Sequence, residues 1–171
     1  MADDRRDEAR CPECGVTRPL DAMRMIDGEP VCVGCLYGDV APITLRPIGV
    51  VINDKRRRPR GFGTTGKAVS EIRLFPGMAR FMRGLADETH LTIVWHLHEA
   101  GSLKTVFARG WDGKRVGPFA SRTPDRITPI AVTDVELIEV KGTTLVVRGL
   151  DAVNGTPVLD IKVAKASLER R

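Results

Sequence analysis

The chain has 171 residues, of which 42% are hydrophobic and 29% charged, and its net charge is +5. This composition is ordinary for a folded domain with its own core, and the length leaves room for one small additional module. The absence of a run of about 18 apolar residues excludes a transmembrane helix, and the first eight residues contain no apolar signal core. We therefore expect a cytoplasmic protein whose mild basic excess permits a phosphate-rich partner without requiring one.

The N-terminal region predicts a tail followed by a metal module. Residues 1 to 10 alternate acidic residues with arginines, and we expect them to be disordered. Two C-x-x-C pairs follow, and their spacing is typical of a zinc ribbon over residues 11 to 40. Four thiolates close a tetrahedral shell around a structural Zn²⁺, which a segment this short needs in order to fold. The four expected ligands are Cys11, Cys14, Cys32 and Cys35.

Two questions about this module stay open. A disulfide pair is the alternative to metal for the cysteines. Ribbons of this kind bind nucleic acid, bind proteins, or only complete their own domain. Between the two pairs, Asp27-Gly28 separates two short strand-like runs and predicts a tight hairpin turn.

The rest of the chain is mainly β. Short segments of alternating apolar and polar residues, mostly linked by tight turns, predict a small antiparallel β-barrel over residues 45 to 164, closed so that it has no edge strands. Apolar residues at helical spacing from Phe75 to Leu85 predict one amphipathic helix packed on the core, and residues 165 to 171 form a charged tail. The expected strands are residues 48–52, 70–74, 89–99, 106–116 (a hairpin), 135–140, 144–148 and 158–163.

Two polar loops are candidates for binding. In residues 117 to 132, Pro124 and Pro129 stiffen the backbone, so that Arg122 and Arg126 project from a rigid support suited to an anion or a carboxylate. Further upstream, five basic residues within six positions predict phosphate contacts with tRNA or another RNA; they are Lys55, Arg56, Arg57, Arg58 and Arg60. For each loop the alternative is a solvated surface segment.

Two phrases of this sequence resemble a known family. One is Phe119-Ala-Ser-Arg-Thr-Pro-Asp-Arg-Ile-Thr-Pro-Ile130, and the other is Leu150-Asp-Ala-Val-Asn-Gly-Thr-Pro-Val-Leu-Asp-Ile-Lys162. Together they are similar to the TrmO (TsaA-like) family of S-adenosylmethionine-dependent methyltransferases. The resemblance covers roughly residues 45 to 163, and it implies a barrel, a homodimer and methyl transfer from S-adenosylmethionine. Typical family members lack the N-terminal ribbon.

The resemblance also implies a set of residues for the methyl donor. The turn formed by residues 154 to 157 would offer backbone amides to the donor, and Arg122 would pair with its carboxylate or orient the substrate. At position 61 a glycine stands where the family has glutamine, and no catalytic base is assigned. The implied donor-binding residues are Pro59, Arg60, Gly61, His98, Glu99, Arg122, Val132, Asn154, Gly155, Thr156 and Pro157.

The family substrate is tRNA, methylated on N6-threonylcarbamoyladenosine. This chain departs from the family phrase at Asp125, Thr128 and Ala131, where the family has histidine, asparagine and glycine. An aspartate there repels phosphate. Two alternatives therefore stay beside N-methylation of this tRNA nucleoside. One is a related methyltransferase acting on another RNA or a small metabolite, and the other is a non-enzymatic module that binds S-adenosylmethionine or RNA.

Overall fold

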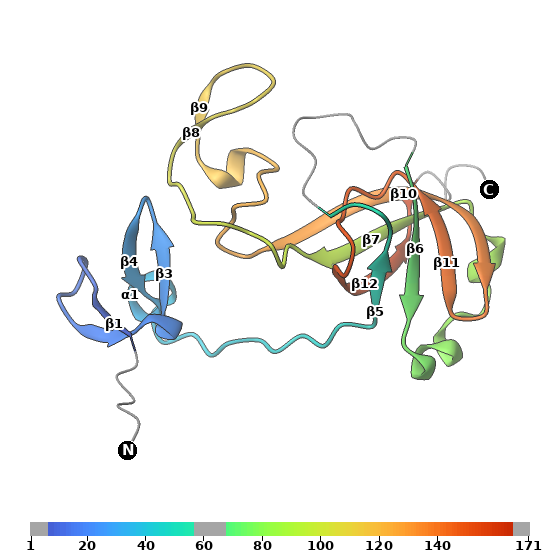
Figure 1. Cartoon of the computed structure of the whole chain (residues 1–171), viewed down its shortest axis with the longest axis horizontal. Coiled ribbons are helices and arrows are strands. Elements are labelled where there is room, and N and C mark those ends of the chain that lie inside the picture. The colour runs from blue at the N-terminus through green and yellow to red at the C-terminus, as the bar shows by residue number, and fades with distance from the viewer. Residues whose placement is uncertain (1–6, 57–67, 166–171) are drawn as a thin grey trace. The chain divides into compact units, whose positions relative to one another are not determined.

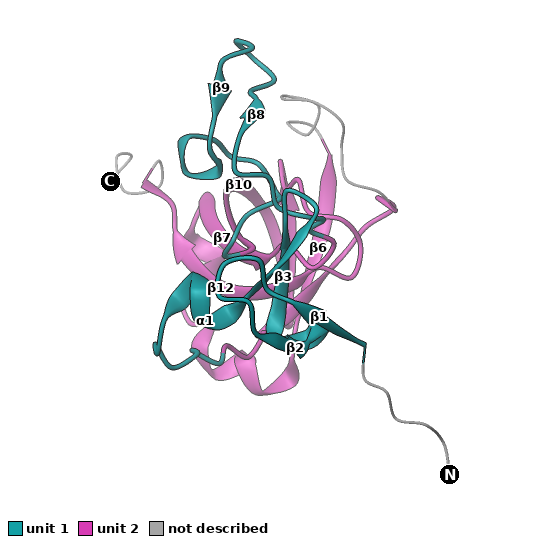
Figure 2. Cartoon of the chain, turned by 90° about the vertical axis from the view of Figure 1, so that its left-hand side faces the viewer, with its two compact units in different colours: residues 1–44, 100–128 teal, residues 45–99, 129–171 magenta. Residues whose placement is uncertain are grey.

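The computed structural model describes residues 7–56 and 68–165 and divides into two compact units. Unit 1 comprises Met1–Thr44 and Ala100–Thr128, and unit 2 comprises Leu45–Glu99 and Pro129–Arg171 (Figures 1 and 2). The sequence predicts a ribbon followed by one uninterrupted barrel domain. In the structure, the segment from residue 100 to 128, inside the predicted barrel domain, belongs to the same unit as the ribbon.

Unit 2 is a closed barrel of six strands in the order β10-β11-β6-β5-β12-β7, and all the neighbouring pairs are antiparallel. The predicted mainly β, closed-barrel fold is thus confirmed. The predicted hairpin over residues 106–116 is not part of the barrel, and β10 begins at residue 130 rather than at the predicted 135. The other five strands follow the predicted segments closely, and all six have the following bounds. They are β5 Gly49–Ile52, β6 Val69–Leu74, β7 His90–His96, β10 Ile130–Lys141, β11 Thr144–Arg148 and β12 Pro157–Val163.

The barrel core follows from strand alternation. Along β7, Leu91, Ile93 and Trp95 are buried while the residues between them are half-exposed, because successive side chains of a strand point to opposite faces. The same alternation in β6 and β11 buries Ile72, Leu145 and Val147, none of which has exposed surface. Each fully buried aliphatic side chain contributes about 1.5–3 kcal/mol, so these inward rows hold the barrel together.

The predicted amphipathic helix is wrong. The chain instead forms two short 3₁₀ helices, η2 Pro76–Phe81 and η3 Leu85–Asp87, with no buried residue in either. Gly84 lies between them at φ 80°, a left-handed conformation that ends the helical path. Phe81 is consequently 75% exposed. Among the described residues, no helix has the length and apolar character needed to span a membrane.

The ribbon in unit 1 is built from two small hairpins. β1 Glu8–Arg10 pairs with β2 Thr17–Pro19, β3 Met23–Ile26 pairs with β4 Glu29–Cys32, and the helix α1 Val33–Tyr37 follows; η1 Leu20–Ala22 links the hairpins. The predicted Asp27-Gly28 turn is confirmed, with φ at 51° and 91°. The expectation of a disordered tail is wrong for residues 8 to 10, because they pair with β2.

The segment from residue 100 to 128 adds to the ribbon hairpin. Leu103 forms a parallel bridge with Ile26, its N–H donates to the Met25 carbonyl at 3.0 Å, and its carbonyl accepts from Asp27 N–H at 2.8 Å. The Asp27 carboxylate accepts from the N–H and hydroxyl of Thr105. Further along lie β8 Phe107–Ala108, β9 Arg115–Val116 and η4 Pro118–Ala120. The Asp27-Gly28 turn of the ribbon therefore holds the start of this long segment, which connects β7 to β10 in the chain.

Candidate functional site

The end of β7 and the start of β12 meet at one rim of the barrel. Thr156 has no exposed surface, and its Oγ1 lies 3.4 Å from Nδ1 of His98. The other ring nitrogen, Nε2, is 4.0 Å from a Glu99 carboxylate oxygen. The family resemblance implies these three residues from separate parts of the sequence, and the fold brings them together. They offer an imidazole, a hydroxyl and a carboxylate at one place.

The amides of the turn before β12 are already engaged. The N–H groups of Asn154, Gly155 and Thr156 donate to the carbonyls of Lys55, Val51 and Val153, at 2.9, 2.8 and 3.3 Å. The expectation that these amides face a methyl donor is therefore wrong for this structure. The exposed groups left at this rim are the side chains of His98 and Glu99, and the buried Thr156 hydroxyl lies behind the His98 ring.

Asn53 holds this turn in place, and the sequence analysis missed it. Its backbone N–H donates to Asn154 Oδ1 at 3.1 Å, and its Nδ2 donates to Ser70 Oγ and to the Ala152 carbonyl, each at 3.0 Å. Its Oδ1 accepts from Lys55 N–H at 3.0 Å. An asparagine directly after a strand, followed by Asp54, is a signal for side-chain-to-backbone bonding that could have identified it.

Replacing Asn53 with alanine is expected to reduce the free energy of unfolding by about 2–3 kcal/mol, because partly buried groups lose their hydrogen bonds. Chemical denaturation in a Trp111→Phe background measures it, since the buried Trp95 then reports on the barrel alone. Asp54→Ala is the control, because Asp54 is an exposed neighbour. Equal effects of the two substitutions would contradict the bracing role.

Lys55 differs from the phosphate-contacting cation that the sequence predicts. Its ammonium donates to the Leu150 carbonyl at 2.6 Å, and burial lowers its pKa. It therefore fixes the chain before the turn rather than standing open to phosphate. In the same basic run Arg56 is exposed, whereas Arg57 and Arg58 lie outside the described residues.

Outside residues 98–99 and 154–157 of the rim, Val132 is the one predicted donor residue that the structure describes within unit 2. Val132 is 53% exposed and pairs with Val94, whose neighbours along β7 are buried, so it lies on the outer face of the barrel. Arg122 is exposed and belongs to unit 1. Pro59, Arg60 and Gly61 lie outside the described residues.

The loop that carries Arg122 is held together by its own side chains. Arg126 does not project, because its Nη1 donates to the carbonyls of Ser121 and Pro118 at 3.0 and 3.3 Å. The Asp125 carboxylate accepts from Gly101 N–H at 2.9 Å and so ties the two ends of the segment. Of the two predicted anion-binding arginines, only Arg122 remains on the surface.

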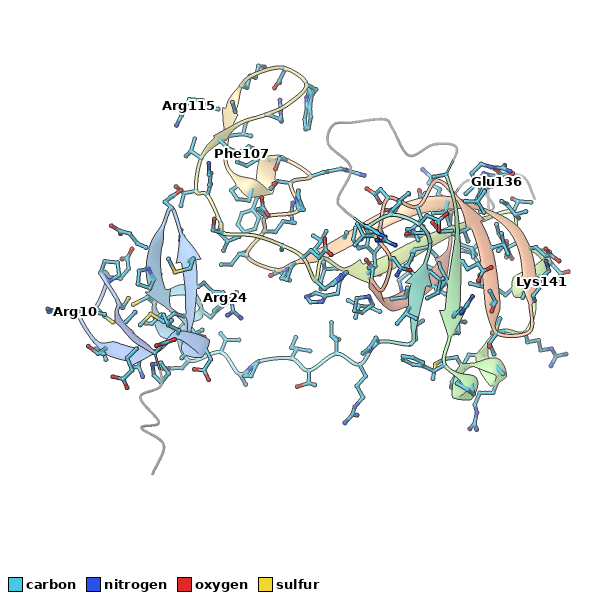
Figure 3. All side chains as sticks on the ribbon, viewed as in Figure 1. Arg10, Arg24, Phe107, Arg115, Glu136 and Lys141 are labelled. Carbon is cyan, nitrogen blue, oxygen red and sulfur yellow. The ribbon has the colours of Figure 1, made fainter. Side chains whose placement is uncertain are left out.

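The four cysteines of the ribbon form a candidate metal centre, and Figure 3 shows sulfur atoms, in yellow, gathered within the ribbon. All four sulfurs lie within 4.8 Å of one another, with Cys11–Cys35 at 3.9 Å and Cys14–Cys32 at 3.8 Å. A tetrahedral shell with Zn–S bonds of about 2.3 Å places sulfurs about 3.8 Å apart. All four thiols are free rather than paired as disulfides, so the donor set fits a tetrahedral metal ion.

The surroundings of the thiols also favour a cation. The backbone N–H of Cys32 donates to the Cys11 sulfur at 3.4 Å, and this hydrogen bond lowers the pKa of the Cys11 thiol. The neighbouring Cys32 sulfur raises the pKa of Cys35 to about 12. The pKa of the Cys32 thiol is lowered too, chiefly by hydrogen bonding from the Cys35 backbone N–H. Two thiolates are therefore favoured while a third beside them is disfavoured, and a bound divalent cation removes that conflict.

Comparison with known proteins identifies the barrel region. The model of the tRNA-methyltransferase O N-terminal domain matches residues 48–167. A probable S-adenosyl-L-methionine-binding protein of Methanothermobacter thermautotrophicus is 39% identical over 123 residues, covering 70% of this chain and 88% of that protein. A human tRNA (adenine(37)-N6)-methyltransferase is 33% identical over 93 residues, covering 53% of this chain and 21% of that protein.

The structural comparison agrees. The crystal structure of TrmO from Pseudomonas aeruginosa superimposes with a TM-score of 0.57 at 25% identity, covering 72% of this chain and 56% of that one. The chain spans only part of several relatives, including 35% of a probable S-adenosyl-L-methionine-binding protein of Archaeoglobus fulgidus that is 33% identical over 129 residues, 74% of this chain. The matched segment contains all six barrel strands and the rim with His98 and Thr156. This chain therefore belongs to the tRNA-methyltransferase O N-terminal domain family.

Proposed function

We propose that the chain is an S-adenosylmethionine-dependent tRNA methyltransferase, with its donor at the barrel rim, and that it N-methylates a modified adenosine of the N6-threonylcarbamoyladenosine type. The family match over residues 48–167 supports this, as do the relatives named for S-adenosylmethionine binding and for tRNA adenine methylation. The observation that carries the proposal is the 3.4 Å approach of His98 to Thr156. It unites two donor-binding segments that the resemblance implies and that lie far apart in the sequence.

The donor would supply a methyl group carried on a positively charged sulfur. An acceptor nitrogen would attack the methyl carbon in line with the breaking carbon–sulfur bond, the sulfur would leave as a neutral thioether, and the proton of the acceptor nitrogen would pass to water. The chain's contribution is alignment and exclusion of water. Thr156 is rigid because its carbonyl accepts from Val51 N–H at 2.9 Å. His98, fixed by that hydroxyl, supplies a hydrogen-bonding ring, and the Glu99 carboxylate places negative charge beside a cationic donor.

The experiment combines donor binding and methyl transfer. Titration calorimetry measures S-adenosylmethionine binding, and labelled donor is then incubated with total tRNA, with tRNA lacking the threonylcarbamoyl group, and with a small-molecule extract. The proposal predicts label in the threonylcarbamoylated tRNA. Label in the extract alone supports the metabolite alternative, and binding without transfer supports a donor-binding module.

Two substitutions at the rim are expected to weaken donor binding. His98→Ala should raise the Kd for S-adenosylmethionine about tenfold, because it removes the exposed ring. Thr156→Val should raise it about fivefold, because it removes the buried hydroxyl that positions this ring. The controls are His90→Ala, at the other end of β7, and Thr92→Val, which removes a hydroxyl on the outer face of the same strand, and both should bind as the parent does. Unchanged Kd values in both rim variants would remove the donor from this rim.

We also propose that the cysteine cluster holds a structural Zn²⁺. The four sulfurs fill every position of a tetrahedral shell, which leaves none for water or substrate. The ion would therefore stabilise the ribbon rather than take part in methyl transfer.

A further inference from the structure

Exposed aromatic rings and cations gather on the segment from residue 104 to 122. Trp111 is 51% exposed and Phe119 is 82% exposed. Trp111 lies in the turn between β8 and β9, and Phe119 lies in η4. Single exposed rings are common on protein surfaces, but these two belong to one short segment that also carries several cations. Neither ring is assigned a role by the donor site or the metal centre.

Arg109 ties the backbone around these two rings together. Its guanidinium lies 4.3 Å from the centre of the Trp111 ring. The same group pairs with the Asp112 carboxylate, and its Nη1 donates to the carbonyl of Ala120, the residue after Phe119, at 3.1 Å. The hairpin tip and η4 are therefore held as one small body. The rings are presented from a braced support and not from independent loops.

The charge of this body is positive. Lys104, Lys114, Arg115 and Arg122 are exposed. The carboxylate of Asp112 is paired with Arg109, and that of Asp125 accepts from Gly101 N–H. The Arg109 N–H donates to the Lys114 carbonyl, so these two residues face each other across the hairpin. Lys114 therefore lies on the face where Arg109 stacks on Trp111. Arg115 pairs with Ala108 and lies on the other face.

We propose that Trp111, Phe119, Lys114 and Arg122 form an RNA-binding platform on which unpaired bases stack. Aromatic faces accept any base, and cations beside them follow the phosphate backbone. The surplus of unpaired positive charge favours a polyanion over an apolar protein surface. The inference rests on the proposed function for the identity of the macromolecule. It deepens that function by locating the contact with the RNA substrate in the segment from residue 100 to 128, outside the barrel.

The test measures affinity for a stem-loop RNA with an unpaired loop and for a fully paired duplex of equal length. The parent chain should prefer the stem-loop. Trp111→Ala and Phe119→Ala should each weaken stem-loop binding about tenfold and leave duplex binding unchanged. The matched control is Phe81→Ala, which removes another exposed ring, on η2. Equal losses in all three variants, or no loss in any, would overturn the platform.

Salt dependence and fluorescence separate stacking from charge. Lys114→Gln should make the plot of log affinity against log salt less steep, by the amount expected for the loss of about one phosphate contact. The control is Lys141→Gln, which replaces an exposed lysine at the end of β10 and should leave the slope unchanged. Stem-loop RNA should quench Trp111 fluorescence, and Trp111→Phe should abolish the quenching while retaining most of the affinity. Quenching that survives in Trp111→Phe would come from Trp95 and would contradict the assignment.

Failure of the platform and failure of the proposed activity give different results. If methyl transfer to RNA fails but stem-loop binding depends on Trp111 and Phe119, the platform stands and the proposed activity falls. If tRNA is methylated equally well by the parent and by Trp111→Ala/Phe119→Ala, the activity stands and the platform falls. If the parent binds no RNA but binds a protein, and the Trp111→Ala/Phe119→Ala variant does not bind that protein, the RNA assignment also falls.

Discussion

Removing the metal from the four-cysteine cluster is expected to unfold the ribbon while leaving the barrel folded. The ribbon's own core consists of Met23 and Val31 packed around the buried cysteines Cys11 and Cys32, which is too little apolar surface to fold without the ion. Structural zinc contributes about 10–16 kcal/mol in comparable small modules. Hydrogen exchange should show complete loss of protection in β3 and β4 after chelation, with β7 and β11 unchanged.

The effect should extend along the chain to the segment from residue 100 to 128. Leu103 and Thr105 lose their partners when the Asp27 turn unfolds, so their amides should exchange faster as well. Cys14→Ser should reproduce the result of chelation, and Ser102→Ala is a control that leaves the ligand set intact. A ribbon that keeps its exchange protection without metal, or a barrel that loses protection together with it, would contradict the division into two independent units.

Gly49→Ala is expected to reduce the free energy of unfolding of the barrel by about 3 kcal/mol. A Cβ at this position would lie 2.5 Å from the Arg73 carbonyl oxygen and 2.9 Å from Leu74 Cα. Both atoms belong to the backbone of β6, which pairs with β5 at this residue, so only a shift of the strand relieves the overlap. Denaturant unfolding followed by Trp95 fluorescence in the Trp111→Phe background measures the loss.

Gly77→Ala is the matched control for that substitution. A Cβ at Gly77 meets nothing within 4 Å, and the residue lies in η2, a helical conformation that alanine adopts readily. Its effect should stay within about 0.5 kcal/mol. A Gly49→Ala barrel as stable as Gly77→Ala would show that β5 and β6 approach less closely than in the structure described here.

The sequence predicts the barrel strands because their signal is local. Alternation in His90–His96 places Leu91, Ile93 and Trp95 on one face, and burial of that face needs no knowledge of the partner strand. The cysteine pairs are equally local, since a C-x-x-C turn directs two sulfurs to one centre. The helix prediction for residues 75 to 85 failed because its apolar positions found no core, while Gly84 interrupted the helical path.

The site was only partly predictable because its contacts are not local. The family phrases imply His98 and Thr156, but their contact depends on the pairing of β7 with β12. The role of Asn53 requires the turn a hundred residues away to be in place. The sequence predicts a projecting Arg126 because it does not reveal that the guanidinium bonds carbonyls of its own loop. Hydrogen-bond partners of this kind follow from tertiary structure and not from composition or periodicity.

Hydrogen exchange with and without S-adenosylmethionine tests the central claim most directly. The account predicts that the donor slows exchange at residues 97 to 99 and 153 to 157, the two chain segments that His98 and Thr156 join, and leaves the amides of β3 and β4 in the ribbon unchanged. Donor binding with no protection in either rim segment, or protection confined to the ribbon, would contradict it.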